Sequence, residues 1–460
     1  MNPTFPIRLS GHASPAPDSH GGEPSTGGGG PNPPWICRWV RTTGPLMLIL
    51  MLTGLVSGPA VHAQLPEAKS VSDVGFDTDR LEVAHATTKR FVDDGRHAGI
   101  ITLLARNGAI ADVQTYGFRD VAGKLPMTRD TICRIYSMSK IITSVGVLVL
   151  LEDGRLNLED PVATHLPELM DLRVMTGGTA EAPQLERLRR QVTIKHLLTH
   201  TSGLIYDFDG DDPLHRLYKR ADLWSGPGLG DFISKVGRLP LRHQPGDQFT
   251  YGINTDVLGA LIERVSGKAF GAFLEERIFG PLGMKDTGFD VPVGKMDRLA
   301  KTYRHGPDGK GLVEAEPMLG AWAESGRGVE SGGAGLFSTV DDYARFAQML
   351  CNGGTLDGQR VLGRKTVELM TANHLALLPE AAHGFNRAKG FGLGVEVSLD
   401  PGRGSVPTSP GQFGWYGAAT TYCQIDPKEK LVAIAFAQHF PFNQHDFFAS
   451  WATAYYQALR

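Results

Sequence analysis

A serine and a lysine lie three residues apart at the start of an apolar run. Ser137 and Lys140 occur in "RIYSMSKIITSVGVLVLLEDGRL", where most residues from Lys140 to Leu151 are apolar. Residues i and i+3 share one face of a helix, so the hydroxyl group and the amine lie within reach of each other. A hydroxyl nucleophile needs a nearby base, and burial makes a lysine easier to deprotonate. The pair therefore predicts nucleophilic catalysis, with Ser137 as the nucleophile and Lys140 as its base.

The position of Ser137 at the beginning of the expected helix adds a second function. Unpaired backbone N–H groups gather at a helix N-terminus and can stabilise a developing oxyanion. The S-x-x-K pattern alone is short and common, however. The alternative is a serine N-cap followed by a lysine that faces solvent.

The elements that position this pair can be placed from hydrophobic periodicity. We expect a helix over residues 78–94, then two strands around Asn107-Gly108, a strong hairpin signal, and then a helix from Ser137 to about Asp153. Residues 153–286 are mostly helical in pattern. Strand signals return in "GFGLGVEV", "GAATTYCQID" and "KLVAIAFAQH", before a closing helix in "HDFFASWATAYYQAL".

Strand signals at both ends of the chain, with helices between them, favour one sheet built from both ends. The expected fold is α/β plus all-α, with an antiparallel sheet flanked by helices and a helical subdomain inserted. We assign residues 75–135 and 300–460 to the α/β part, and residues 136–299 to the helical subdomain.

Six segments, in order along residues 75–455, resemble the serine β-lactamase and penicillin-binding protein superfamily. The closest similarity is to the class C-like branch, particularly the family VIII carboxylesterases, and it implies a β-lactamase/transpeptidase-like fold. The segments are "TICRIYSMSKIITSVGVLVLLEDGRLNLEDPVATHLPEL", "VTIKHLLTHTSGL", "LPLRHQPGDQFTYGINTDVLGALIERVSG", "IFGPLGMKDTGF", "GGAGLFSTVDDYARF" and "GQFGWYGAATTYCQIDP".

The resemblance implies a role for each matching residue. Ser137 is the acyl-accepting nucleophile and Lys140 its proton partner. Tyr251 stands at the tyrosine of the family's Y-x-N motif, where it can transfer protons. Trp415, Tyr416 and Gly417 match K-T-G, and the N–H groups of Ser137 and Ala418 would form the oxyanion hole. Trp415, Gly417 and Ala418 are thus the expected oxyanion-hole and substrate-binding residues.

Two departures from the family pattern affect the expected substrate. The motif asparagine is replaced by Ile253, with Asn254 one position late, so an amide contact near the site is expected to be missing. The K-T-G lysine is replaced by Trp415, which can pack against an acyl group but cannot pair with a carboxylate. The favoured activity is therefore carboxylesterase action on short-chain or neutral esters. A β-lactamase, a D-Ala-D-Ala carboxypeptidase or a D-amino-acid amidase is the alternative.

Other classes of protein fit less well. The sequence has no G-x-S-x-G elbow of an α/β-hydrolase. His196 and His200 have i, i+4 spacing that could face a metal, but no nearby glutamate supplies the base of a metallohydrolase, so neither metal nor cofactor is expected. A penicillin-recognising binding protein would keep the fold without needing Ser137, Lys140 and Tyr251. The net charge of −3 without a basic stripe argues against nucleic acid as a partner. The expected partner is a small-molecule ester or amide substrate. The sequence does not indicate the oligomeric state of the protein.

The N-terminal region predicts export. Residues 1–34 are rich in Gly, Pro and Ser and form an expected disordered extension. Residues 35–63 have the pattern of a signal peptide, with Arg38 and Arg41, an apolar stretch at 46–56 and a cleavage site ending at Ala63. A membrane anchor is the alternative, but the stretch is shorter than the ~20 residues that a span needs. The expected location is the periplasm or the medium. Cys37 would leave with the signal peptide, and the other three cysteines form no disulfide framework.

Overall fold

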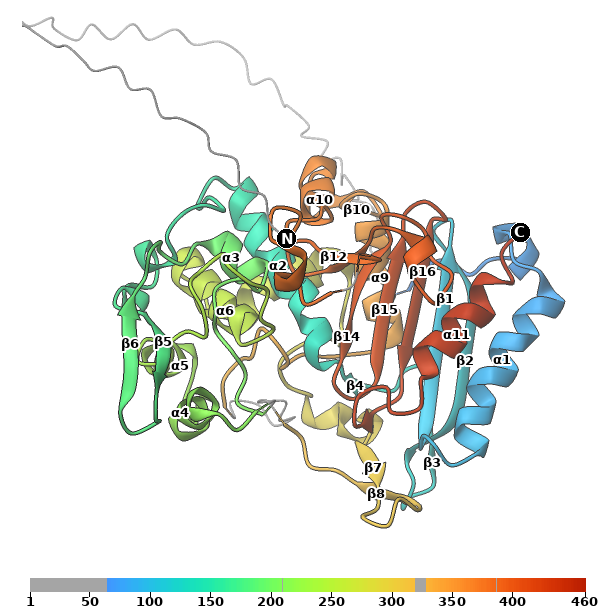
Figure 1. Cartoon of the computed structure of the whole chain (residues 1–460). Helices are drawn as coiled ribbons and strands as arrows, with labels where there is room; N and C mark the ends of the chain where they lie inside the picture. The colour runs from blue at the N-terminus through green and yellow to red at the C-terminus, as the bar shows by residue number, and fades with distance from the viewer. Residues whose placement is uncertain (1–63, 209, 319–327, 386) are drawn as a thin grey trace, which may run out of the picture. The chain divides into compact units, whose positions relative to one another are not determined.

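The computed structural model describes residues 64–460, except 209, 319–327 and 386 (Figure 1). These residues belong to one compact unit. The extension and signal peptide expected at 1–63 lie outside the described residues. Within the part that is described, no helix has both the length and the apolar character needed to cross a membrane.

An eight-stranded antiparallel sheet forms the centre of the unit, in the order β12-β13-β14-β15-β16-β1-β2-β3. Strand β1 pairs with β16, with Ile101 opposite Phe436, so the two ends of the chain build one sheet, as expected. Figure 1 shows the blue strands β1 and β2 beside the red strands β15 and β16. The strands are β1 (Gly99–Arg106), β2 (Ala109–Asp120), β3 (Leu125–Pro126), β12 (Lys389–Phe391), β13 (Glu396–Ser398), β14 (Phe413–Gly417), β15 (Thr421–Asp426) and β16 (Leu431–Phe436).

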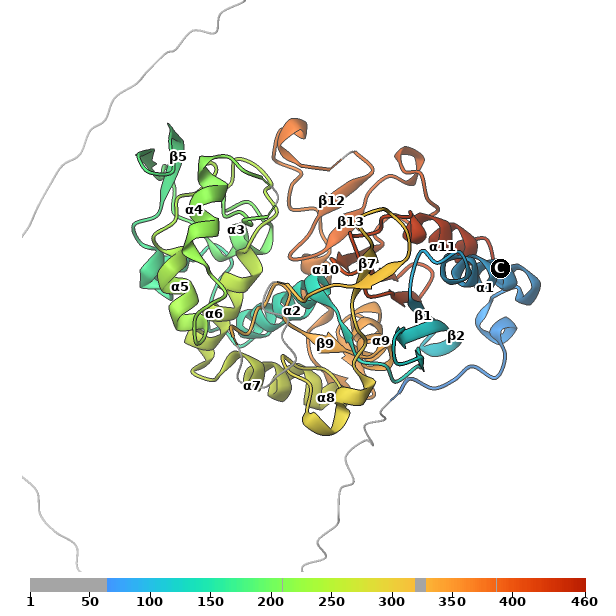
Figure 2. The same ribbon diagram turned by 90° about the horizontal axis from the view of Figure 1, so that it is seen from below.

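The alternation of side chains along the central strands explains the layers around the sheet. Ile100 and Leu104 of β1 pack on one face with α1 (Thr78–Asp93) and α11 (Phe447–Tyr456). Ile101 and Leu103 face the opposite core, where α9 (Val340–Cys351) contacts β1, β15 and β16. Figure 2 shows α1 and α11 together on one side of this sheet.

The local signals for the first hairpin and for several helices are confirmed. Asn107 and Gly108 join β1 to β2 with φ of 56° and 83°, the left-handed conformation that a tight hairpin turn requires. Helices occur where periodicity predicts them in α1, α9 and α11. Helix α6 (Asn254–Ser266) ends at Gly267, whose φ is 73°.

The middle of the chain departs from the expected pattern in two ways. A hairpin of β5 (Arg173–Gly178) and β6 (Pro183–Arg187) occurs in a region expected to be mostly helical, with few strand signals. Most of its residues are at least partly exposed, so they carry no apolar alternation. The expected helix in "GAFLEERIFGPLGM" is three pieces: α7 (Phe270–Leu274), a π-helical turn (Glu275–Phe279) and α8 (Gly280–Leu282).

The remaining helices and strands are short. The predicted boundaries between the α/β part and the helical subdomain stay predictions. The elements are α3 (Ile194–Leu198), α4 (Pro213–Ala221), α5 (Leu229–Val236), α10 (Arg364–Met370), β4 (Cys133–Arg134), β7 (Tyr303–His305), β8 (Leu312–Glu314), β9 (Phe337–Ser338), β10 (Thr355–Leu356), β11 (Gln359–Arg360) and β17 (His439–Phe440).

The helix that follows Ser137 is buried along nearly its whole length. It is α2 (Ser139–Glu152), which packs against α6 and α7, and this burial explains the apolar run in the sequence. Ser137 itself lies in a 3-10 turn, Tyr136–Met138, that leads directly into α2. The helix therefore runs as far as expected, but the serine stands one turn before it, and no side chain caps its N-terminus.

Candidate active site

Lys140 lies at the centre of a buried hydrogen-bond network. Its Nζ donates to Ser137 Oγ at 3.1 Å, to Tyr206 Oη at 3.0 Å and to the Gly333 carbonyl oxygen at 2.7 Å. Lys140 is only 1% exposed, so these three contacts take the place of water around Nζ. The structure thus brings Ser137 and Lys140 together as the spacing predicted.

A strained residue precedes the serine. Tyr136 has a φ of 44°, in the left-handed region, which is costly for a bulky side chain. Its ring is buried and packs near Phe440 and against Ala334 and Ala419. This packing holds the conformation that turns the chain from β4 into α2 at Ser137.

A buried carboxylate lies on the other side of Lys140. Asp256 accepts hydrogen bonds from Ser331 Oγ at 2.5 Å and from the Gly333 N–H at 2.8 Å. Burial raises the pKa of Asp256, and the positive charge of Lys140 opposes that rise. Gly333 therefore links the two side chains: its N–H donates to the carboxylate, and its carbonyl oxygen accepts from Lys140 Nζ. A Cβ at Gly333 would lie 2.6 Å from Asp256, so only glycine fits there.

Two tyrosines lie beside the lysine, and they differ in their contacts. Tyr206 accepts from Lys140, whereas Tyr251 Oη accepts from the indole N–H of Trp415 at 3.2 Å. The Tyr251 ring lies 4.7 Å from Lys140 Nζ, measured to the ring centroid. Tyr206 was not predicted from the sequence. Its only signal was its position two residues after the family-like segment ending in "HTSGL".

The side-chain amide contact that was expected to be missing at Ile253 is made by the next residue, Asn254. Asn254, the first residue of α6, contacts His200 Nδ1 through its Nδ2 at 2.9 Å and accepts from Ser202. The His200 ring in turn packs on Tyr251, with ring centroids 4.9 Å apart. Burial holds the pKa of His200 well below its usual range, so the ring is neutral. Asn254 therefore positions the tyrosine through His200.

The two histidines of the alternative metal pair make separate contacts. His196 Nδ1 accepts from the Thr193 N–H at 3.1 Å as part of a capping box at the start of α3. His200 Nδ1 contacts Asn254 instead. Each ring therefore serves a separate structural contact.

The end of β14 lies directly against the turn that carries Ser137. Thr421 Oγ1 donates to the Ile135 carbonyl oxygen at 3.1 Å. A Cβ at Gly417 would lie 2.3 Å from that same oxygen, which explains the glycine. This close approach puts Ala418 and Ser137 on the wall of one cavity, as the predicted oxyanion hole requires.

Comparison with known proteins decides the family. The Beta-lactamase family model matches residues 84–458. The chain belongs to the Beta-lactamase family. Protein Rv1367c of Mycobacterium tuberculosis is 35% identical over 373 residues, covering 78% of this chain and 90% of that protein.

Two further relatives carry descriptions of activity. Esterase EstB of Burkholderia gladioli is 30% identical over 382 residues, covering 76% of this chain and 89% of that protein. The structure of EstCE1, described as a hydrolase with promiscuous acyltransferase activity, has a TM-score of 0.71 at 26% identity. It covers 82% of this chain and 99% of the EstCE1 chain. The β-lactamase/transpeptidase-like fold is thereby confirmed.

The cavity of this Beta-lactamase family member has a volume of about 620 Å³. Aromatic side chains contribute eight of the described residues that line it, and among those described residues Lys389 is the one Lys or Arg. Lys389 forms an ion pair with Glu396, so its charge is neutralised. The aromatic residues of the lining are Tyr206, Phe208, Tyr251, Trp415, Tyr416, Tyr422, Phe442 and Phe448.

Proposed function

We propose that this hydrolase is a carboxylesterase that acts on neutral esters through an acyl-enzyme on Ser137. The observation that carries the proposal is the contact of Lys140 Nζ with Ser137 Oγ at 3.1 Å, beside an aromatic cavity. The esterase and acyltransferase relatives support this reaction class.

In the acylation step, Lys140 enters as the neutral amine: Ser137 Oγ attacks the ester carbonyl carbon while its proton moves to the lone pair of Lys140 Nζ. The negative charge on the carbonyl oxygen is stabilised by the N–H groups of Ser137 and Ala418. The tetrahedral intermediate then collapses, the bond to the alcohol oxygen breaks, and the leaving alkoxide takes a proton.

Tyr251 is the proposed donor of that proton. Its oxygen accepts from Trp415, which leaves its own hydroxyl hydrogen to be donated to the leaving group. Lys140, protonated in the first step, then restores the proton of Tyr251. Tyr206 holds the lysine in place through its hydroxyl oxygen.

In the second step, a hydroxyl compound releases the acyl group. Water gives the free acid, whereas an alcohol gives a new ester, and in both cases the acceptor's proton returns by the same route. Hydrolysis and acyl transfer therefore differ only in the acceptor. The cavity is wide enough to admit an alcohol of moderate size.

The preference for neutral esters rests on Trp415. Its indole ring packs on Tyr251 and Phe391, with centroids 5.5 Å and 5.3 Å away, and faces the cavity where relatives with K-T-G carry a lysine. The cation described in the cavity wall, Lys389, is paired with Glu396. A substrate carboxylate would therefore be desolvated without a partner, a costly state.

The experiment compares p-nitrophenyl esters, nitrocefin and a D-Ala-D-Ala peptide on the wild-type chain and on Ser137→Ala. We expect hydrolysis of the esters by the wild type and its loss in Ser137→Ala. Mass spectrometry should find the acyl group on the peptide containing Ser137. Peptide cleavage without ester turnover would replace this proposal with the carboxypeptidase alternative.

A further inference from the structure

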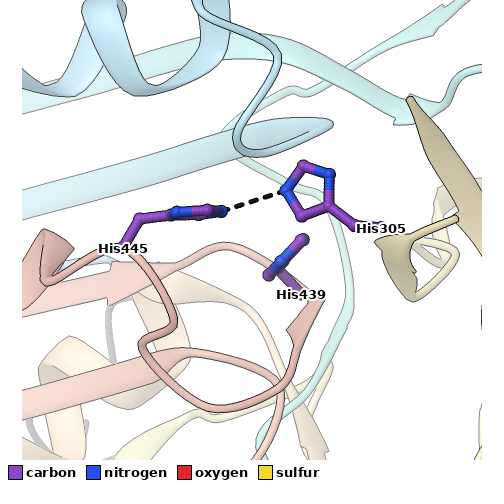
Figure 3. Close-up of side chains that lie close together, drawn as sticks. All are labelled: His305, His439 and His445. Carbon is purple, nitrogen blue, oxygen red and sulfur yellow. Dashed lines mark hydrogen bonds between the residues drawn. The ribbon is translucent and has the colours of Figure 1, made fainter. Parts of the chain in front are cut away.

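Three histidines from separate segments converge at one edge of the molecule, outside the catalytic network. His305 ends β7, His439 begins β17, and His445 lies just before α11. One nitrogen of each ring lies within 4.8 Å of the others, and His305 Nε2 is 3.0 Å from His445 Nε2. Figure 3 shows the three rings turned toward a common point.

The outer contacts of two rings leave the inner nitrogens available as ligands. His305 Nδ1 lies 3.2 Å from the Gly311 carbonyl oxygen, which can only accept, so Nδ1 carries the hydrogen and Nε2 has the lone pair. His439 Nε2 lies 3.3 Å from Gln444 Oε1, and His439 Nδ1 is buried without a hydrogen-bond partner. Such outer hydrogen bonds are how proteins orient metal-binding imidazoles.

A fourth histidine at the same place is also unsatisfied. His97 is 1% exposed, and neither of its ring nitrogens has a hydrogen-bond partner. Its ring centroid lies 4.8 Å from that of His439 and 5.8 Å from that of His445. Buried polar atoms without partners are costly, and an ion at this cluster would account for the gathering of four imidazoles.

We propose that His305, His439 and His445 bind one divalent transition-metal ion of the zinc type. Nitrogen donors favour zinc, nickel and copper over calcium and magnesium, which prefer oxygen. Zinc bound at ~2.0–2.1 Å in a tetrahedral site separates its ligand nitrogens by about 3.3 Å. The observed spacings bracket this separation, so small side-chain rotations suffice.

The ion has a structural consequence for the substrate cavity. Two of its ligands, His439 and His445, flank a segment whose Phe442 and Asn443 line the cavity. The His439 N–H also donates to the Ala419 carbonyl oxygen at 2.9 Å, next to the proposed oxyanion residue Ala418. The ion would therefore join β7 to this segment and hold one wall of the cavity in place.

The test uses the whole chain purified without a histidine tag, stripped with a chelator and dialysed against Zn²⁺. We expect one zinc per chain by elemental analysis, and a rise in melting temperature on zinc addition because the ion binds only the folded state. His305→Gln and His445→Gln should each weaken zinc binding at least about tenfold, the scale of losing part of a metal site. Both positions are partly exposed, so these variants should fold.

His374→Gln is the matched control. His374 is partly buried and contacts the Leu369 carbonyl oxygen at 2.9 Å, away from the cluster. This variant should bind zinc as the wild type does. The proposal is overturned if the wild type retains no zinc, or if the double variant His305→Gln/His445→Gln binds zinc as tightly as the wild type. Circular dichroism on each variant separates lost binding from lost folding.

Discussion

At the scale of the residue, Lys140 is the point on which the proposed chemistry depends. It contacts the nucleophile, a tyrosine and a backbone carbonyl, and no water is needed to satisfy it. We expect Lys140→Ala to lower kcat for ester hydrolysis by about 10² or more, the scale of lost acid–base catalysis. Lys195→Ala, which removes a surface lysine paired with Glu159, should leave kcat unchanged. Wild-type turnover by Lys140→Ala would remove the lysine from the mechanism.

The proposed roles of Tyr251 and Tyr206 can be distinguished with esters that have different leaving groups. A general acid matters for alkyl esters, whose alkoxide needs a proton, and matters little for p-nitrophenyl esters, whose phenolate leaves without one. We therefore expect Tyr251→Phe to lower kcat/KM about 10²-fold for alkyl esters and much less for p-nitrophenyl esters. Tyr206→Phe should lower both similarly, because it acts through Lys140. Equal losses for both substrates in Tyr251→Phe would exclude it as the acid.

Trp415 is the residue proposed to set substrate charge. We expect the wild-type kcat/KM for short-chain p-nitrophenyl esters to exceed that for nitrocefin by at least ~10², since losing a carboxylate partner costs several kcal/mol. Trp415→Lys should shift this ratio toward nitrocefin. Trp415→Phe keeps an apolar ring without a charge, so the ratio should stay high. A ratio that is the same in all three proteins would mean that Trp415 does not decide specificity.

At the scale of the element, the capping box of α3 contains a proton-sensitive contact. Burial lowers the pKa of His196 to about 4, below the ~6.5 of an exposed histidine. The unfolded chain then binds more protons than the folded one between these values, so the free energy of unfolding falls as the pH drops. The stabilisation is fully present above pH ~6.5 and is lost as the pH falls through about 4.

We expect His196→Gln to reduce this acid sensitivity. Glutamine at the third helical position can still accept from the Thr193 N–H but does not titrate. Between pH 6.5 and pH 4, its melting temperature should fall less than that of the wild type, by about 2 °C or more. His196→Ala loses the acceptor and should melt lower at both pH values. If the melting temperatures of His196→Gln and the wild type fall by the same amount between pH 6.5 and pH 4, the prediction is wrong.

The sequence predicts elements whose signals are local. Asn107-Gly108 needs only its own backbone preference, and α2 only its apolar run. The β5–β6 hairpin has no such signal, because neither face of it is fully buried. Contacts between residues far apart in the sequence could not be predicted either. The contact of Tyr206 with Lys140, and that of Asn254 with the histidine that packs on Tyr251, form only when the chain folds. The same holds for His305, His439 and His445, which stand in unrelated segments.

At the scale of the whole molecule, the predicted signal peptide ends at Ala63, and Gln64 is the first described residue of the folded unit. Gln64 Nε2 donates to Asp341 Oδ2 at 3.0 Å, and Leu65 is buried. Cleavage after Ala63 would thus remove none of the contacts described for the folded unit. We expect N-terminal sequencing of the exported protein to begin at or near Gln64. Recovery of a chain in the cytosol that starts at Met1 would contradict this prediction.

The pairing of β1 with β16 also determines the order in which the protein can fold. Ile101 pairs with Phe436, which lies more than three hundred residues later in the sequence. The middle of the sheet therefore has a very high contact order, and a high contact order slows folding. While the ribosome makes the chain, β1 and β2 can form a hairpin, but β1 keeps an unpaired edge until β16 emerges. An unpaired strand edge can form hydrogen bonds with a strand of another chain, which leads to aggregation. A chain truncated before residue 431 should therefore aggregate rather than accumulate as a smaller folded protein.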